Sequence, residues 1–535
     1  MKFLGKEISG QFTIPSGIIT TNIKVVEKLA NEIPEIGVIT TKSIGPEPKP
    51  GNREPIITQY ASGCFMNAVG LTNPGYKEFA KQLSQLKIPK DKFLLTSIFG
   101  KNVEEFVIVA KELAPYSDAL ELNLSCPHAK GYGMAIGQDP EAVKEITKAV
   151  KAAVSIPVIP KLTPNTNNLG EIAKAAVEGG ADAICAINTV GPGEFTSHGS
   201  PVLTNTRGGM SGKGVLPIGL KCIKEIREAV SVPIIGMGGI SCADDVKAYE
   251  IAGATIFGVG SALAGMSTQE LKEYFSKLGK DMKEGTNTAS GKMKRIDMAF
   301  KKFKLVENKK LADDLSILVF DGNVNVKPGQ FFFVWVPGKG EKPFSALDDK
   351  PLTLAIHKRG CLTEELVKLK EGDEVFLRGP YGNEVKAKEG KKVILVGGGT
   401  GVASIYQIAR DFGNTEFFFG ARDAAHLYYK DKIAECSKLE IATNDGSEGT
   451  EGFVTEILKK RLEELKGEEL MFFNCGPPQM IEAIVAIEKE CAKEEDIYSS
   501  VEFVTKCGIG ICGACANEKG ERLCVDGPYF DEVGK

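Results

Sequence analysis

Between about residues 38 and 265 the chain repeats one pattern, a short apolar run followed by an amphipathic helical stretch. Each repeat reads as a buried parallel strand and the helix that covers it. About seven or eight such units match a closed (β/α)8 barrel in size and order, whereas an open doubly wound sheet rarely needs so many. Strands are expected at residues 38–41, 93–97, 119–122, 158–161, 183–187, 233–236 and 255–259, and helices at 140–154, 168–178, 219–229 and 243–251.

Polar side chains recur at the carboxyl ends of these predicted strands. The carboxyl ends of parallel strands meet at one rim of a barrel, and the active sites of such barrels are built there. We therefore expect the polar residues that follow successive strands to share one site. They are Lys42, Asn123, Cys126, Lys161, Asn188 and Thr189.

The segment from Glu121 to His128 carries a thiol, an amide and an imidazole close together. Pro127 cannot extend the strand, because proline has no backbone N–H to donate. Taken alone, Cys126 is more often a small buried hydrophobe than a catalyst, as most free cysteines are. Its position where a barrel strand ends favours the catalytic interpretation.

Two glycine-rich stretches follow the last two predicted strands, at residues 236–239 and 258–261. Glycines before a helix allow backbone N–H groups to face an anion, and a phosphate site after the last strands recurs in these barrels. One such stretch could be only a tight turn, but two at adjacent strands predict a phosphate group. The residues concerned are Gly238, Gly239, Gly260 and Ser261.

The length and net charge of the chain limit the number of domains and the kinds of partner that it can have. A length of 535 residues predicts about two to four domains. A net charge of −4 indicates no general affinity for nucleic acid or for an anionic membrane. The first residues are charged where a signal peptide needs an apolar run, no apolar stretch is long enough to span a bilayer, and most cysteines are scattered singly. We expect a cytoplasmic protein without a membrane or nucleic-acid partner.

The pattern changes after about residue 282. Residues 283–292 are a run of small and polar residues, and we expect a flexible linker over residues 283–297. From residue 298 to 388, short alternating runs separated by turns predict a small antiparallel β-barrel. A buried strand then leads into a glycine turn at residues 397–401, with further parallel strands expected at 416–420, 440–443 and 469–476. This order predicts a nucleotide-binding α/β domain over residues 389–497.

The C-terminal region holds four clustered cysteines. Their spacing of x4, x2 and x8 is that of [2Fe–2S] proteins, and the intervening glycines allow the chain to wrap a cluster. A zinc ribbon is the alternative, but it more often pairs two Cys-x2-Cys knuckles, and the region has one. We expect a [2Fe–2S] domain over residues 498–535, with Cys507, Cys512, Cys515 and Cys524 as ligands.

Several motifs of the first 265 residues occur in the order of one known family, class 1B dihydroorotate dehydrogenase, which the barrel resembles. The motifs lie at residues 42–52, 67–75, 121–127, 161–165, 187–189, 208–212 and 236–239. The resemblance implies a pyrimidine substrate held by Asn67, Asn123, His128, Asn188 and Thr189, with the backbone after Asn67 receiving a carboxylate. It implies FMN bound by Lys42, Lys161, Gly212, Gly238, Gly239, Gly260 and Ser261, with both lysines facing the isoalloxazine ring.

The resemblance also makes Cys126 the general base that removes the C5 proton of the substrate, with Lys42 beside it in the catalytic set. A free thiol has a pKa of about 8.5, so either the site lowers that pKa or the enzyme prefers alkaline pH. The glycines of residues 129–137 suit a lid that closes over the substrate.

One residue departs from the family pattern. The family usually has asparagine where this chain has His128, and Cys-Pro-His resembles dihydropyrimidine dehydrogenase instead. Uracil lacks a carboxylate, so a uracil site has no need of the anion-receiving backbone after Asn67. Because residues 67–71 keep the dihydroorotate-type motif, dihydroorotate is the favoured substrate. His128 could also be a lid residue that only packs.

The second half is similar to the ferredoxin-reductase family, in which FAD binds the β-barrel and a nicotinamide nucleotide binds the α/β domain. Lys342 replaces the arginine of the family's flavin motif, which loses a planar fork of donors. The resemblance implies FAD at Lys342, Pro343, Phe344, Ser345, Gly360 and Thr363. It implies NAD at Gly397, Gly399, Gly401, Cys475, Gly476 and Pro477.

Together, residues 298–535 look like the iron–sulfur electron-transfer subunit that partners the class 1B enzyme, here fused behind its barrel of residues 1–282. The resemblance implies that electrons pass from FMN to the cluster, then to FAD and NAD+, in an oxidoreductase of pyrimidine biosynthesis that forms a homodimer. Two alternatives stay open: a pyrimidine reductase of the dihydropyrimidine dehydrogenase type, and an electron-transfer flavoprotein whose barrel is not catalytic. A tRNA-modifying flavin barrel is disfavoured, because the net charge offers no RNA surface.

Overall fold

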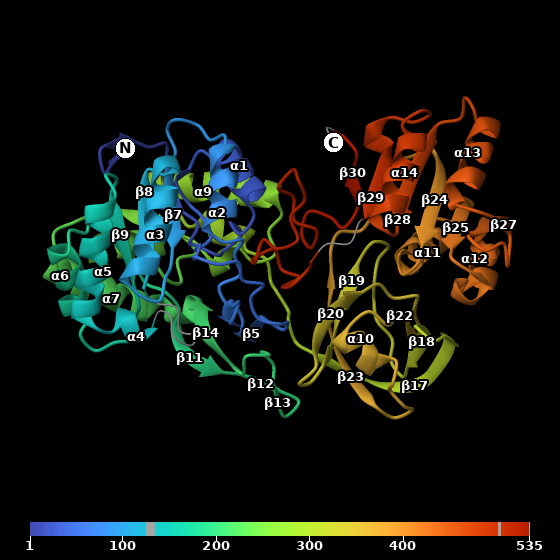
Figure 1. The fold of residues 1–535 in the computed structure, drawn as a ribbon, viewed down its shortest axis with the longest axis horizontal. Helices are drawn as coiled ribbons and strands as arrows, with labels where there is room; N and C mark the ends of the chain where they lie inside the picture. The colour runs from blue at the N-terminus through green and yellow to red at the C-terminus, as the bar shows by residue number, and fades with distance from the viewer. Residues whose placement is uncertain (125–133, 501–503, 534–535) are drawn as a thin grey trace. The chain divides into compact units, whose positions relative to one another are not determined.

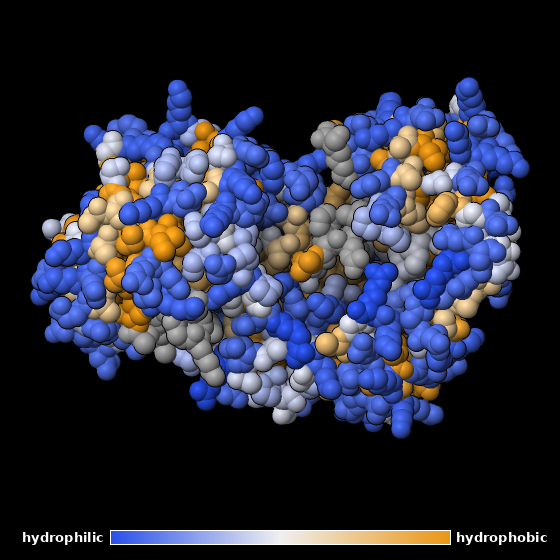
Figure 2. All heavy atoms as spheres, viewed as in Figure 1, coloured by the Kyte–Doolittle hydropathy of each residue, from blue (hydrophilic) through white to orange (hydrophobic). Residues whose placement is uncertain are grey.

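A computed structural model of the protein describes residues 1–124, 134–500 and 504–533. The chain forms two compact units. The first contains Met1–Met298 and Ile509–Arg522, and the second contains Ala299–Gly508 and Leu523–Lys535. Among the described residues, no helix is long and apolar enough to cross a membrane. On the face drawn in Figure 2, hydrophilic side chains predominate and apolar ones occur in small groups.

The first unit is built around a closed barrel of eight parallel strands, as predicted (Figure 1). One strand escaped prediction, because β3 is only two residues long and carries no pattern. Around the ring the order is β3 (Phe12–Thr13), β4 (Ile36–Thr40), β7 (Phe93–Ile98), β8 (Ala119–Asn123), β9 (Val158–Leu162), β10 (Ile184–Ala186), β15 (Ile234–Met237) and β16 (Ile256–Gly258).

Helices cover the outside of this barrel, and most of them are amphipathic and bury their apolar face. The predicted helices are confirmed within a few residues at their ends. The set comprises α1 (Ile23–Glu32), α2 (Tyr76–Ser84), α3 (Val103–Leu113), α4 (Met134–Gly137), α5 (Pro140–Ala153), α6 (Leu169–Glu178), α7 (Leu216–Ala229), α8 (Ala243–Ala252) and α9 (Thr268–Glu284).

The inside of the barrel has an apolar layer and, above it, a polar one. Leu95, Ala119 and Ile159 belong to one buried cluster. Side chains of a strand alternate between its two faces, so the residues two positions further on also face inward. On β7, β8 and β9 these are Ser97, Glu121 and Lys161. The polar layer therefore lies at the carboxyl ends of the strands, where the site was expected.

A four-stranded antiparallel sheet, which the sequence pattern did not reveal, lies outside the barrel strands. Its glycine-rich strand β14 (Arg207–Gly212) has no alternation of apolar and polar residues. The sheet carries two predicted site residues, Asn67 and Gly212, and its order is β11 (Val190–Glu194), β14 (Arg207–Gly212), β6 (Cys64–Asn67) and β5 (Ile57–Ala61).

The predicted flexible linker is partly folded against α9 instead. The buried carboxylate of Asp281 accepts hydrogen bonds from Thr288 Oγ1 at 2.8 Å and from Ala289 N at 2.7 Å. Ala289 is fully buried, and a 3-10 helix runs from Thr288 to Lys292. Small polar residues here cap a helix end, a role that composition alone does not distinguish from flexibility.

A C-terminal segment, residues 509–522, packs on the rim of the first unit. Ile19 N donates to Ile511 O at 2.6 Å, and Gly265 N donates to Ile509 O at 2.8 Å. The buried guanidinium of Arg522 donates to the carbonyls of Gly510 and Met266, each at 2.8 Å. The segment is thus fixed to the loops that follow β3 and β16.

The second unit begins with a seven-stranded antiparallel sheet, and its ladder does not close on itself among the described strands. Long strand β17 (Lys301–Ala312) pairs with β18 (Leu315–Phe320) through its second half and with β23 (Glu374–Tyr381) through its first. The remaining strands are β19 (Phe331–Val336), β20 (Gly340–Phe344), β21 (Asp348–Asp349) and β22 (Leu352–His357), and α10 (Cys361–Leu366) follows β22.

A parallel sheet covered on both faces forms the rest of this unit. Alternate residues of its strands enter two separate apolar clusters, one with α11 (Gly401–Phe412) and α12 (Lys430–Cys436), the other with α13 (Val454–Glu464) and α14 (Pro478–Glu488). This is the predicted nucleotide-binding architecture. The strand order is β27 (Thr450–Glu451), β26 (Ser437–Thr443), β25 (Thr415–Ala421), β24 (Lys392–Gly398), β28 (Leu470–Cys475), β29 (Ile497–Ser500) and, antiparallel at the edge, β30 (Phe530–Asp531).

Candidate functional site

An open cavity lies at the carboxyl ends of the barrel strands. The described residues that the sequence predicted for substrate and FMN all line it, although they are far apart in the chain. Other lining residues, such as Ser16, Ser43 and Ser211, were missed because a lone serine carries no sequence signal. The predicted residues brought together are Lys42, Asn67, Asn123, Lys161, Asn188, Thr189, Gly212, Gly238, Gly239, Gly260 and Ser261.

Two buried lysines line the cavity. Lys42 is 6% exposed and Lys161 is 4% exposed. Burial alone would lower the pKa of Lys161, but the nearby Glu121 carboxylate raises it above its ordinary value. Lys161 is therefore an ammonium ion at neutral pH. Such a charge suits a ligand that becomes more negative during the reaction.

The glycines of the cavity are required by the barrel's own atoms. A Cβ at Gly212 would lie 2.1 Å from the carbonyl oxygen of Gly63, and one at Gly239 would lie 2.9 Å from Leu216. Gly212, Gly238 and Gly239 also have positive φ angles of 98°, 130° and 78°. Ser261 Oγ donates to Ser211 Oγ at 2.8 Å beside them. Backbone N–H groups of glycines in this conformation can face an anion, so these residues, called the glycine wall below, are compatible with the phosphate group of FMN.

Amide side chains also line the cavity. Thr189 N donates to Asn188 Oδ1 at 2.8 Å, and Asn188 Nδ2 donates to Asn123 Oδ1 at 3.4 Å. Asn67 Nδ2 donates to the carbonyl oxygen of Gly209 at 3.4 Å. Amides fixed in this way present both donors and acceptors to a heterocycle with alternating N–H and C=O groups.

Two predicted residues of this site, Cys126 and His128, lie outside the described residues, as does the first part of the predicted lid, residues 129–133. Their roles stay predictions. The described strand that leads to them, β8, ends at Asn123 in the cavity wall.

The four C-terminal cysteines are all buried, with at most 6% of any side chain exposed. Positive φ angles of 80°, 70° and 66° occur at Gly508, Gly510 and Gly513, between or beside the cysteines. Glycines in that conformation let a chain curl around a cluster, and thiolates are the ligands that iron–sulfur clusters use. No group of three or more His, Cys, Asp or Glu side chains that could hold a metal ion occurs among the described residues. The assignment of Cys507, Cys512, Cys515 and Cys524 as cluster ligands therefore stays a prediction.

The residues predicted for FAD lie on the antiparallel sheet and on α10. Lys342, Pro343 and Phe344 belong to β20, and Ser345 follows it. Thr363 Oγ1 accepts hydrogen bonds from Arg359 N at 2.8 Å and from Gly360 N at 3.0 Å. That hydroxyl therefore caps the start of α10.

The residues predicted for NAD lie at the carboxyl ends of two adjacent strands. Gly397 of β24 pairs in register with Cys475 of β28. A Cβ at Gly401 would lie 2.3 Å from the carbonyl oxygen of Cys475, so the two following turns are in contact. Gly399 has a φ of 55° and its carbonyl accepts from Tyr428 Oη at 2.8 Å. Gly476 and Pro477 complete this edge before α14.

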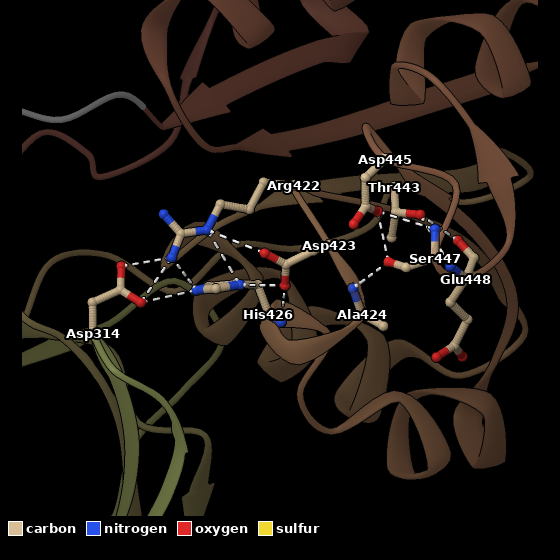
Figure 3. Close-up of polar contacts among 9 residues, drawn as sticks. All are labelled: Asp314, Arg422, Asp423, Ala424, His426, Thr443, Asp445, Ser447 and Glu448. Carbon is tan, nitrogen blue, oxygen red and sulfur yellow. Dashed lines mark hydrogen bonds and ion pairs between the residues drawn. The ribbon is translucent and has the colours of Figure 1, made fainter.

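A polar cluster that the sequence did not predict lies at the same sheet's carboxyl edge (Figure 3). His426 contacts Asp423 Oδ1 through Nδ1 at 2.6 Å and Asp314 Oδ1 through Nε2 at 2.9 Å. These contacts lower the pKa of both aspartates. Ser447 Oγ accepts from Ala424 N at 2.8 Å and so ties the loops after β25 and β26 together.

Comparison with known proteins supplies the family. A family model described as "Dihydroorotate dehydrogenase" matches residues 1–282, one described as "Oxidoreductase NAD-binding domain" matches 395–486, and one described as "Iron-sulfur cluster binding domain of dihydroorotate dehydrogenase B" matches 502–533.

Curated relatives match the barrel half of the chain. The catalytic subunit of dihydroorotate dehydrogenase B (NAD(+)) from Methanocaldococcus jannaschii is 42% identical over 263 residues, which are 48% of this chain and 85% of the relative. The subunit of the same name from Methanocella arvoryzae is 43% identical over 263 residues, with the same coverage. That from Pyrococcus horikoshii is 39% identical over 285 residues, 53% of this chain and 92% of the relative.

These matches cover the cavity-bearing barrel and two modules of the remaining chain. They agree with the sequence resemblance and identify the protein as an oxidoreductase. The chain therefore belongs to the dihydroorotate dehydrogenase family, and it joins the catalytic barrel of the B type to an NAD-binding domain and an iron–sulfur-binding domain in one polypeptide.

Proposed function

We propose that the protein oxidises (S)-dihydroorotate to orotate and passes the electrons from FMN to a [2Fe–2S] cluster, then to FAD and NAD+. The observation that carries this proposal is the convergence of the two lysines, three amides and glycine wall on one cavity. When bound, FMN and FAD supply two-electron chemistry and the cluster supplies one-electron transfer. This role belongs to de novo pyrimidine biosynthesis, in a cytoplasmic homodimer.

The chain's own residues have separate tasks in this proposal. Asn67, Asn123 and Asn188, with Thr189, orient the pyrimidine ring, and Lys161 with Lys42 holds positive charge beside the flavin. Cys126 takes the proton that leaves C5 of the substrate. The domain division proposed for these tasks is 1–282 for FMN and substrate, 283–297 as linker, 298–388 for FAD, 389–497 for NAD and 498–535 for the cluster.

The packing of residues 509–522 on the barrel supports a cluster near FMN. Ile509 and Ile511 bond to the loops that carry Ile18 and Ser261, and both of those residues line the cavity. Electron transfer between the cavity and a cluster held by this segment would need only a short path through the first unit.

Anaerobic mixing with dihydroorotate and, separately, with dihydrouracil tests the substrate. We expect dihydroorotate alone to bleach the visible flavin band of the reconstituted protein. Bleaching by dihydrouracil alone would replace the proposal with a dihydropyrimidine dehydrogenase, the reading that His128 favours. Bleaching by neither, with NADH still reducing FAD, would favour an electron-transfer flavoprotein with a non-catalytic barrel.

Substitution of the predicted base gives the first mutational test. We expect Cys126→Ala to slow dihydroorotate-driven bleaching by about 10²–10⁴-fold, the usual contribution of a general base. NADH-driven reduction of FAD stays normal, because that reaction does not use the barrel. The matched control is Cys222→Ala, which removes a buried thiol of α7 that does not line the cavity. Equal rates in both variants would exclude Cys126 as the base.

A further inference from the structure

One fully buried carboxylate, that of Glu121, lies in the polar layer beneath the cavity. It does not line the cavity, and neither its sequence position nor the family resemblance gave it a role. Glu121 Oε1 accepts a hydrogen bond from Ser97 Oγ at 2.8 Å and lies 3.6 Å from Lys161 Nζ. Glu121 thus contacts Lys161, which lines the cavity, and Ser97, which leads toward the amide side chains of the cavity.

The charge on this carboxylate is balanced by Lys161. The titratable side chains facing the ammonium are Glu121 from β8 and Cys185 from β10, and Lys42 lines the same cavity. Burial raises the pKa of the Cys185 thiol well above its usual range, so Cys185 is neutral. Glu121 Oε2 has no hydrogen-bond partner in the described part of the chain. The counter-charge of Lys161 is therefore Glu121.

A row of hydroxyl groups connects Glu121 to the cavity wall. Ser97 Oγ lies 2.8 Å from Ser43 Oγ, and Ser43 Oγ lies 2.9 Å from Ser16 Oγ. Asn123 Nδ2 also contacts Ser43 Oγ, at 3.0 Å. Ser43 and Ser16 line the cavity, whereas Ser97 is fully buried.

The contact of Glu121 with the Lys161 ammonium and the hydrogen bond that it accepts from Ser97 Oγ decide the direction of the hydrogen bonds in this row. A carboxylate only accepts, so Ser97 must spend its one proton on Glu121 and can only accept from Ser43. Ser43 then has no proton left, so it accepts from its other neighbours. Asn123 must therefore turn its NH2 group, not its carbonyl, toward Ser43.

The fixed direction of hydrogen bonding continues from Asn123 to Asn188. With its NH2 group held by Ser43, Asn123 presents Oδ1 to the Nδ2 group of Asn188 at 3.4 Å. Asn188 is fixed in the matching orientation, because its Oδ1 accepts from Thr189 N at 2.8 Å. The faces that these amides offer to a ligand are thus set from Glu121 at one end and from a backbone N–H at the other.

We propose that Glu121 is a positioning residue that acts on both sides of the cavity: it keeps Lys161 charged for the flavin, and through Ser97 and Ser43 it fixes the orientation of the Asn123 amide for the substrate. This inference rests on the proposed function, since it assigns FMN to the lysine side and orotate to the amide side. The two effects can be separated, because each depends on a different neighbour of Glu121.

The lysine side is tested by Glu121→Gln. The amide oxygen can still accept from Ser97, but the counter-charge is gone, and burial then lowers the pKa of Lys161. We expect the variant to hold FMN at pH 7 and to bind it at least about tenfold more weakly than the native protein at pH 9.5. FMN and FAD retained after gel filtration at each pH are counted after denaturation, with FAD in the same chain as the internal control. Equal FMN retention by both proteins at pH 9.5 would overturn this half of the proposal.

The amide side is tested by Ser97→Ala. Ser43 then regains a free proton and Asn123 can present either face, so we expect orotate to bind up to about tenfold more weakly, the value of one well-placed hydrogen bond. FMN retention at pH 9.5 stays native, because Glu121 and Lys161 are intact. The matched control is Thr96→Val on the same strand, which removes a buried hydroxyl that bonds to Ser117 Oγ at 2.6 Å instead. Calorimetric titration with orotate compares the proteins, and native affinity in Ser97→Ala would overturn this half.

Failure of the proposed function has a different signature. If the native protein itself neither binds orotate nor is bleached by dihydroorotate, the substrate assignment is wrong. If the native protein does both and the variants match it, the substrate assignment stands and the role of Glu121 is wrong. Should Glu121→Gln not fold, Ser97→Ala still tests the connection from Glu121 to Asn123.

Discussion

Two buried ion pairs, one in each unit, show how differently the same chemistry can be used. In the antiparallel sheet, Arg378 donates to Glu341 through Nε at 2.9 Å and through a second nitrogen at 2.6 Å. Its remaining nitrogen donates to Tyr381 Oη and to the carbonyl of Cys507, each at 2.9 Å. In the barrel, Lys161 lies 3.6 Å from Glu121, and one carboxylate oxygen has no partner among the described residues.

The difference separates a structural pair from a functional one. Arg378 uses its donors on protein atoms and stacks on the ring of Phe333 at 4.1 Å, so it has nothing to offer a ligand. Lys161 lines an open cavity and is held by one long contact. A fully satisfied pair fixes the fold around it, whereas a loosely held charge at a cavity wall stays available for binding.

Breaking the Arg378–Glu341 pair, called the closed pair below, is expected to have the largest effect on stability. Arg378→Ala leaves the Glu341 carboxylate buried without its partner, which typically costs about 3–5 kcal/mol. The chain's single tryptophan, Trp335, lies in the same sheet and pairs in register with Glu341, so its fluorescence in a denaturant titration reports this region. We expect Glu121→Gln to change mainly ligand binding. If it loses as much stability as Arg378→Ala does, the distinction between a structural and a functional ion pair is wrong.

A buried carboxyl group that pairs with no cation among the described residues, that of Glu488, extends the comparison. Glu488 is fully buried, and burial raises its pKa well above the usual range despite a hydrogen bond from Asn474 Nδ2 at 2.7 Å. The folded protein keeps this proton while the unfolded chain releases it above about pH 4.3, so stability falls as pH rises from there toward the folded pKa.

Glu488→Gln lacks that proton equilibrium. We expect its stability advantage over the native protein to grow by up to about 1.4 kcal/mol per pH unit above pH 5 and to vanish below pH 4. Thermal unfolding at pH 4, 6 and 8 measures it, with exposed Glu482→Gln on the same helix as the control. An advantage that does not depend on pH would mean that Glu488 is ionised in the folded protein.

The smallest effect is expected for an exposed pair. Lys144 Nζ lies 2.6 Å from Glu178 Oε2, as close as the contact in the closed pair, but both side chains are substantially exposed. Water and salt screen such a pair, and holding two long side chains together costs entropy. We expect Lys144→Met to leave the thermal midpoint unchanged within error. A clear shift would show that distance, not burial, decides the strength of these pairs.

The sequence predicted the parts of the fold that have a strong local pattern. Apolar runs such as residues 93–97 and 158–161 identified barrel strands, whereas two-residue β3 and glycine-rich β14 carried no such pattern. The same holds for the site. Lys42 and Lys161 were predicted as site residues because they lie at the ends of predicted strands. A role for Ser97 and Glu121 is visible only in the structure, where neighbouring strands bring their oxygen atoms within 2.8 Å of each other. The role of such a serine depends on a hydrogen bond to another strand, so its position in the sequence does not reveal it.

The glycine wall of the cavity has a consequence for how such a protein can diversify. Side chains at Gly212 and Gly239 are excluded by Gly63 and Leu216, which are parts of the barrel itself and present whatever ligand is bound. Mutations there are lost through misfolding before any new specificity can be selected. Val69, Leu71 and Met210, which also line the cavity, carry side chains and are free of that restriction. Descendants of this protein with new substrates would therefore keep these glycines unchanged and accumulate their differences at such side-chain-bearing positions.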